Sequence, residues 1–149
     1  MKFSKKNIFI GLVIFLIIAQ FFPIDKTNPP IEEPLDFIKI QQAPPAIAKM
    51  LKASCYDCHS HHTVYPWYTS VAPVSWMIKS HIKNGRAKLN FSEWGNYDAK
   101  QKSQKMEKSV EVVYEIKSMP MFSYTLMHGP GKLSNDQRKE LTDWFAQQK

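Results

Sequence analysis

The stretch Cys55-Tyr56-Asp57-Cys58-His59 decides how the rest of this 149-residue chain is interpreted. Two cysteines three positions apart, with a histidine directly after the second, form the attachment pattern of a c-type haem. On the last turn of a helix, the thiols of Cys55 and Cys58 reach the two vinyl groups of a porphyrin. His59 then lies under the ring, where its imidazole ligates the iron as the proximal ligand. The chain has only these two cysteines, so the motif predicts one covalent haem c and leaves no thiol for a structural disulfide.

Two other kinds of site use the same residue types. A thioredoxin-like redox pair needs an α/β setting around the two cysteines, and the sequence shows no βαβ pattern. A zinc site would combine Cys55 and Cys58 with two of His59, His61 and His62. The two ligand pairs of a Cys₂His₂ site are normally separated by a dozen or more residues, whereas these histidines crowd against the second cysteine. His61 and His62 lie too near His59 to reach the opposite face of a haem, so we interpret them as surface groups.

Residues 1–22 predict an N-terminal signal anchor that forms a transmembrane helix. Three lysines precede the apolar run Ile8–Phe22, which is interrupted only by Gln20. Fifteen residues span roughly 23 Å, short for a bilayer core of about 30 Å, so a cleaved signal peptide is the alternative. The segment before Pro23 lacks the small-x-small residues of a cleavage site. We expect an uncleaved single-pass anchor in a bacterial inner membrane, with the rest of the chain in the periplasm, where c-type haem is attached.

The net charge of the chain is +7, but the predicted anchor contributes three of the lysines. Residues 23–149 keep 17 Lys and Arg against 13 Asp and Glu, a net charge of +4. Nucleic-acid binding needs a dense basic face, and this balance provides none. The remaining excess is suited to steering an acidic redox protein toward the domain.

The remainder of the chain divides into a tether and one domain. Residues 23–43 with the following Pro44-Pro45 hold six of the ten prolines, and we expect an extended, semi-rigid tether at 23–43. Within it, Leu35, Phe37 and Ile38 are apolar enough to lie along the domain surface instead. Residues 44–149 form the predicted haem-binding domain.

Helical signals recur throughout this domain, and no convincing period-2 strand appears, so the predicted fold is all-α. Pro44-Pro45 opens a helix with the apolar face Ile47, Met50 and Leu51, which delivers the haem motif at its C-terminal end. The other expected helices run over Pro73–Lys83, stopped by Asn84-Gly85; from Ser92 through Trp94 as a short turn; from the cap Asp98 to Lys117; and from a Ser134/Gln137 capping box, with Leu141, Trp144 and Phe145 facing inward.

A six-coordinate haem needs a second axial ligand on its opposite face. Met119-Pro120 follows the long helix, and the proline keeps the chain extended there, so Met119 is the predicted distal ligand. His128 is the alternative, because a neutral imidazole also ligates iron and would lower the redox potential. Met121, Met127, His81 and an open sixth position also stay as alternatives at this point.

Three further residues are candidates for contacts with the porphyrin. Tyr65 and Trp67 belong to a group of aromatic residues after the motif, and aromatic rings bury area efficiently against a flat apolar macrocycle. Arg86 follows Gly85 and has the planar fork suited to a haem propionate. For each of these residues an ordinary structural role is the competing interpretation.

These residues together resemble the bacterial haem-binding domain family, which comprises small membrane-anchored c-type cytochromes. The similarity runs from about Ala43 to Trp144, and three blocks of sequence carry it. They are Cys55-Tyr56-Asp57-Cys58-His59-Ser60 with Thr63 and Tyr65-Pro66-Trp67-Tyr68; Gly85-Arg86 with Leu89-Asn90-Phe91-Ser92-Glu93-Trp94; and Met119-Pro120 with Ser123-Tyr124, His128 and Leu133-Ser134. The resemblance implies a cytochrome-c-like helical domain around a covalent haem, in which the terminal helix packs across the helix carrying the cysteines.

The expected function is therefore that of a membrane-tethered periplasmic c-type cytochrome, an electron carrier rather than an enzyme. Such a carrier needs a redox protein as partner, which the sequence does not identify. A haem enzyme or a gas or redox sensor with an open or displaceable sixth ligand is the alternative. A zinc or structural module without haem is the third hypothesis.

Overall fold

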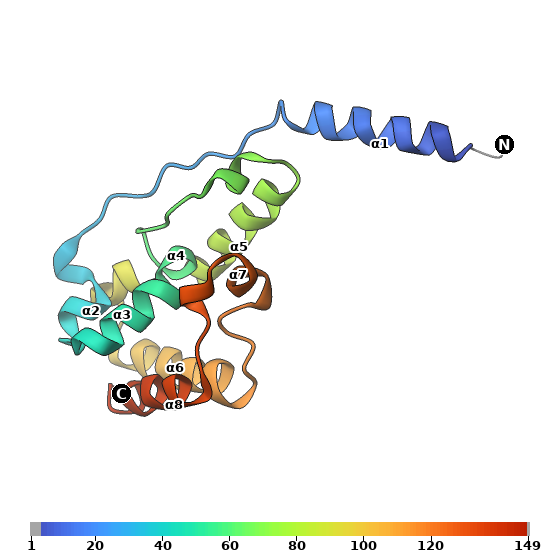
Figure 1. Cartoon of the computed structure of the whole chain (residues 1–149). Coiled ribbons are helices and arrows are strands. Elements are labelled where there is room, and N and C mark those ends of the chain that lie inside the picture. Colours follow the sequence, from blue (N-terminus) through green and yellow to red (C-terminus); the bar gives the residue numbers. More distant parts are fainter. Residues whose placement is uncertain (1–3, 149) are drawn as a thin grey trace.

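The computed structural model describes residues 4–148, and the elements found there are all helical. Figure 1 shows α1 projecting from a helical body, to which an extended segment joins it. The predicted all-α class is confirmed, and the arrangement is consistent with a cytochrome-like helical fold. The α-helices are α1 (Lys5–Ala19), α2 (Phe37–Ile40), α3 (Pro45–Ser54), α4 (Tyr56–His59), α5 (Val74–Lys88), α6 (Ala99–Val110), α7 (Phe122–Met127) and α8 (Asn135–Ala146). The short 3₁₀ turns are η1 (Glu33–Leu35), η2 (Trp67–Ser70), η3 (Phe91–Asn96) and η5 (Gly129–Gly131), and η4 (Glu111–Glu115) is a π-helix.

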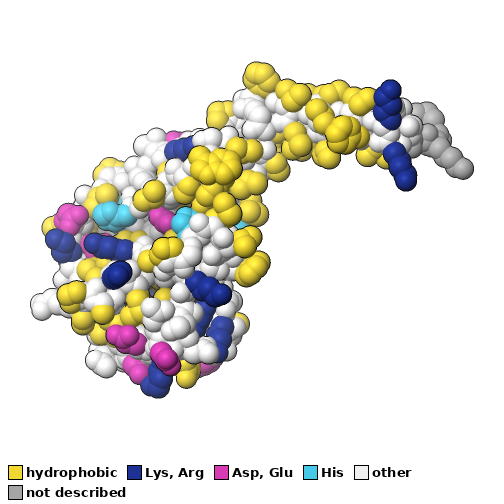
Figure 2. All heavy atoms as spheres, in the orientation of Figure 1, with side chains coloured by type: hydrophobic (Ala, Val, Ile, Leu, Met, Phe, Trp, Pro, Cys, Tyr) yellow, Lys and Arg dark blue, Asp and Glu magenta, His cyan; other side chains and the backbone are white. Residues whose placement is uncertain are grey.

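The transmembrane anchor predicted at residues 1–22 is contradicted by the structure. Apolar side chains cover much of the surface of α1 (Figure 2). However, no helix between residues 4 and 148 combines the length and the hydropathy that a membrane span requires. The physical reason is length, because α1 has 15 residues and a span needs about 20. The predicted location as a single-pass inner-membrane protein is therefore wrong for the described residues.

Hydrogen bonds hold the segment after α1 against α5 and the loop before it. The side-chain amide of Gln20 donates to the carbonyl of Ala72 at 3.0 Å and accepts from the Ala72 N–H at 3.1 Å. The indole of Trp76 donates to the Phe22 carbonyl at 2.9 Å, and the ammonium of Lys79 donates to the Asp25 carbonyl. Residues 20–25 thus lie along the start of α5.

Proline and capping residues start the helices of the body where the sequence predicts them. Pro45 opens α3, as its fixed φ allows. Asp98 and Ser134 each accept from the N–H three residues on, and Gln101 and Gln137 complete two capping boxes. Two helix ends differ from the prediction. α5 continues through Gly85 to Lys88, and α6 ends at Val110, where the π-helix η4 replaces the expected run to Lys117.

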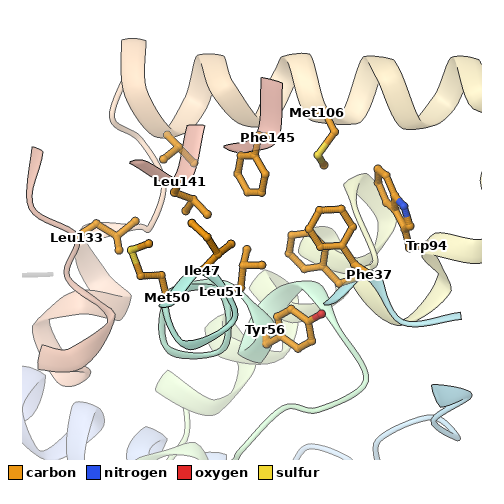
Figure 3. Packing of buried hydrophobic residues seen from close by; sticks show 12 residues of the cluster. Phe37, Ile47, Met50, Leu51, Tyr56, Trp94, Met106, Leu133, Leu141 and Phe145 are labelled. Atoms are coloured by element: carbon orange, nitrogen blue, oxygen red, sulfur yellow. The ribbon is translucent and has the colours of Figure 1, made fainter. Parts of the chain in front are cut away.

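One hydrophobic core joins α3, α6 and α8 with α2 and η3 (Figure 3). Leu51, Leu141 and Met106 are fully buried where these helices meet. Phe37, which precedes the predicted domain start at residue 44, is also fully buried. Its ring lies 4.7 Å from the Trp94 ring and 4.9 Å from the Phe91 ring. The α2 segment therefore contributes one of the central aromatic side chains of the core.

Candidate functional site

The motif residues form a single helical turn directly after α3. The N–H groups of Cys58 and His59 both donate to the Cys55 carbonyl, at 3.2 and 2.9 Å. Tyr56, between the cysteines, is buried on the Phe91 ring and donates its hydroxyl to the Asp36 carboxylate at 3.1 Å. The turn is therefore fixed to the core through Tyr56, and both cysteines are free and half-buried at its surface.

The environment of the two thiols bears on the redox-pair hypothesis. Burial raises the pKa of Cys55 to about 12, with the neighbouring Cys58 adding to the shift. Burial raises the pKa of Cys58 to about 11, Asp57 adds to the shift, and Arg86 partly opposes it. A disulfide-exchange enzyme needs an attacking thiolate with a lowered pKa. Both groups are thiols at neutral pH, which disfavours a thioredoxin-like pair.

His59 is oriented by a backbone carbonyl. Its Nδ1 lies 3.0 Å from the Leu89 oxygen, where α5 ends, so Nδ1–H donates and the lone pair of Nε2 stays available. Burial lowers the pKa of His59, which favours the neutral imidazole that ligates metals. A second hydrogen bond that fixes the tautomer is the usual support of a ligating histidine.

Close packing of α4 against α5 sets the position of this turn. A Cβ built on Gly85 would lie 2.6 Å from the Cys58 carbonyl oxygen and 3.2 Å from its carbon. Glycine is therefore required here for the approach of two backbones, and not as a helix stop. The same approach brings the end of α5, with the Leu89 carbonyl, to His59.

Arg86, on the next position of α5, already has three hydrogen-bond acceptors from the chain. Its Nε donates to the Ser60 carbonyl at 2.8 Å, and Nη2 donates to Asn28 Oδ1 and Thr63 Oγ1, each at 2.9 Å. The guanidinium thus ties the segment around Asn28 to the loop that follows the motif. The sequence suggested that Arg86 binds a haem propionate. Its Nε and Nη2 donors are, however, already used in these contacts within the chain.

The two aromatic candidates lie in different surroundings. Tyr65 is half-buried, and its hydroxyl oxygen is buried without a hydrogen-bond partner in the described chain. Burial raises the pKa of this phenol. Trp67 is 76% exposed and meets Tyr68 edge-on at 5.8 Å between ring centroids. Tyr65 therefore offers an unused buried donor, whereas Trp67 presents an exposed ring.

Met119 and His128 differ in what surrounds them. Met119 is half-buried and packs against the same core cluster as Cys55 and Leu89. The His128 ring stacks on Tyr124 with centroids 4.1 Å apart, and Nδ1 lies 3.1 Å from the Tyr124 carbonyl. Its Nε2 lies 3.1 Å from the Tyr68 hydroxyl. With Nδ1–H donating and Nε2 accepting, both nitrogens of His128 are occupied.

Of the other residues weighed as ligands, Met121 and His81 are half-buried and Met127 is exposed.

Sequence reasoning missed two residues near the motif. Tyr124 donates its hydroxyl to Asp57 Oδ2 at 2.8 Å and is 2.9 Å from the Ala53 carbonyl, so α7 is anchored to the haem-motif turn. His61 is buried, not a surface group as predicted: Nδ1–H donates to the Pro30 carbonyl at 2.8 Å, and Nε2 accepts from Asn90 at 2.9 Å. Only tertiary neighbours reveal these roles, and nothing in the local pattern signals them.

The donor set fits a haem better than a zinc ion. Among residues 4–148 no three His, Cys, Asp or Glu side chains converge into a group that could hold a metal. A c-type haem requires fewer protein groups than a zinc ion. It needs two thiols on one turn and an imidazole whose non-ligating nitrogen donates a hydrogen bond. Cys55, Cys58 and His59 meet these requirements.

Comparison with known proteins agrees with this geometry. The haem-binding domain family matches residues 14–147. Cytochrome c peroxidase Ccp of Escherichia coli (strain K12) is 28% identical over 97 residues, which is 64% of this chain. The chain spans only 21% of the length of that peroxidase. No solved structure matches the chain. The family match covers most of the sequence, including the turn that carries both cysteines and His59, and the chain belongs to the haem-binding domain family.

Proposed function

We propose that this chain is a c-type cytochrome domain that holds one covalent haem and transfers electrons. The proposal rests chiefly on one observation: the hydrogen bond between His59 Nδ1 and the Leu89 carbonyl, on the turn that presents Cys55 and Cys58. In the bound state the haem supplies a one-electron ferrous–ferric couple. The chain supplies thioether links through its two cysteines, the proximal imidazole, and a buried setting that governs the redox potential.

We propose Met119 as the distal ligand. It is half-buried and packs against the hydrophobic core, and the nitrogen atoms of His128 are hydrogen-bonded to Tyr68 and Tyr124. Recruiting His128 would break those contacts and its stacking on Tyr124. A methionine thioether also suits an electron carrier of high potential. The unused buried hydroxyl of Tyr65 supports a polar contact of this residue with the porphyrin substituents.

The test uses full-length protein produced in a host that assembles c-type cytochromes. We expect a mass equal to the polypeptide plus one haem, retained under denaturing conditions, and a pyridine haemochrome typical of two thioether links. The double variant Cys55→Ala/Cys58→Ala should carry no covalent haem. Wild-type protein that weighs no more than its polypeptide would refute the proposal.

A haem enzyme or sensor is the second candidate, because a stretch of this chain is similar to a protein named as a cytochrome c peroxidase. The two functions differ in the sixth position of the iron. Rapid binding of carbon monoxide by the ferrous protein would favour the enzyme or sensor, and slow or absent binding would favour the carrier.

The proposed partner is an acidic redox protein. Residues 23–149 carry a net charge of +4, which two haem propionates would lower to about +2, and this positive excess attracts an acidic surface at low ionic strength. The rate of electron exchange with an acidic test protein should fall as salt is added. A rate independent of salt would refute electrostatic steering.

A further inference from the structure

The backbone around Met119 is held from two directions. After η4, Lys117 adopts a positive φ of 57°, which turns the chain back toward the helix it has just left. The Met119 N–H then donates to the Val112 carbonyl at 3.1 Å. This hydrogen bond fixes the amide side of the residue.

Arg138 holds the other side of Met119. It lies in the first turn of α8, whose start is set by the Ser134/Gln137 capping box, and its side chain is half-buried. Its Nη1 donates to the Val113 carbonyl at 2.6 Å and also to the Met119 carbonyl. One guanidinium nitrogen therefore joins the π-helix η4, the Met119 segment and α8.

We propose that Arg138 is a positioning residue for the distal ligand: it fixes the Met119 backbone and so determines how readily other ligands displace the thioether. This inference rests on the proposed ligation by Met119. Arg138 acts through the backbone of this segment, because its side chain donates to the carbonyls of Val113 and Met119. Without the Arg138 guanidinium, the segment from Met119 onward is held by the hydrogen bond to Val112 and by its own packing.

The competing groups follow closely in the same stretch of chain. Met121 and Met127 lie within eight residues of Met119. An added small molecule such as imidazole competes in the same way, because it binds the iron only after the thioether leaves. A hydrogen bond that stabilises the attached state lowers the apparent affinity for imidazole by the same factor by which it favours that state.

The experiment uses haem-loaded, full-length ferric protein and the variants Arg138→Ala and Arg138→Lys. Lys139→Gln is the matched control, because Lys139 is the next residue of α8, is exposed, and pairs with Asp143 instead of the Met119 segment. Imidazole titrations are followed through the sulfur-to-iron charge-transfer band in the far red. Removing a charged hydrogen bond should strengthen imidazole binding about tenfold or more in Arg138→Ala, and Lys139→Gln should match wild type.

Arg138→Lys keeps the positive charge but replaces a planar fork with a single point donor, so an intermediate affinity is expected. It also decides the test if Arg138→Ala does not fold. A purely structural role would lower the melting temperature and leave the imidazole affinity of the folded protein unchanged. Wild-type imidazole affinity in the folded Arg138 variants would therefore overturn the inference.

Failure of the inference is separable from failure of the proposed function. Met119→Leu should lose the far-red band while keeping the mass of one covalent haem. If Met119→Leu keeps the band, Met119 is not the ligand and the role of Arg138 falls with it, although the covalent cytochrome stands. If the wild-type mass lacks haem, the proposed function itself is refuted.

Discussion

The close approach of α5 to the haem-motif turn predicts that Gly85→Ala is destabilising. The added Cβ would lie 2.6 Å from the Cys58 carbonyl oxygen, and an ordinary contact begins at 3.4 Å. The two backbones must therefore separate by roughly 0.8 Å, and neither can rotate away as a side chain would. Overpacking of this kind costs about 1–3 kcal/mol, and the gain in helix propensity returns up to about 1 kcal/mol. Because the clash is with backbone atoms, we take the overpacking cost at the upper end of this range and expect a net decrease of about 2 kcal/mol in the free energy of unfolding.

Thermal unfolding followed by circular dichroism measures this loss. For a domain of this size, about 2 kcal/mol corresponds to a decrease in melting temperature of roughly 4–8 °C. The same displacement moves the Leu89 carbonyl away from His59, so the yield of covalent haem should fall as well.

Gly95→Ala is the matched control, because its nearest contact is also at 2.6 Å but is made by the methyl group of Leu35. That side chain can shift, and we expect a loss of less than about 1 kcal/mol. A Gly85→Ala variant as stable as wild type, or more stable, would refute the account of how α4 and α5 pack.

Three further predictions concern the core, the contact of α7 with the haem-motif turn, and the thiols. Phe37→Ala should cost about 3–5 kcal/mol in urea unfolding, because a fully buried ring in the aromatic cluster is removed; a loss below about 1 kcal/mol would show that α2 is not part of the core. Tyr124→Phe removes the hydroxyl that donates to Asp57 Oδ2 and lies 2.9 Å from the Ala53 carbonyl, so it should cost about 1–3 kcal/mol by the same assay, with wild-type stability as the contrary result. In haem-free Cys55→Ala protein, iodoacetamide should alkylate Cys58 on the order of a hundredfold more slowly at pH 8.5 than it alkylates an unstructured peptide. The reason is that burial raises the Cys58 pKa to about 11, so less thiolate is present, and the rate should climb until the pH passes that value; equal rates would contradict the burial of the thiol.

The sequence predicts those parts of the fold whose causes are local. The starts of α3, α6 and α8 depend on a proline or a capping side chain within four residues, and each lies where expected. The end of α5 depends on a distant neighbour. Gly85 looks like a helix stop in sequence, but it serves the contact with Cys58 and the helix continues.

The same distinction applies to the candidate site. The spacing of Cys55, Cys58 and His59 is local and is visible in the sequence. The hydrogen-bond partner of His59 is a main-chain oxygen thirty residues away in the sequence. Because every residue type supplies such an oxygen, no sequence pattern predicts this contact. The contact of Arg138 with the Met119 carbonyl cannot be predicted from the sequence either, because a basic residue in a terminal helix is most often solvated.

The paired hydrogen bonds between Gln20 and Ala72 have a practical consequence for anyone trimming this chain for crystallisation. The glutamine amide mimics a neighbouring strand, since it satisfies both the N–H and the C=O of one residue. A shortened version beginning at residue 21 or later would return those two groups to solvent and free the loop that leads into α5. The first residue of a well-behaved fragment should therefore lie at or before position 20.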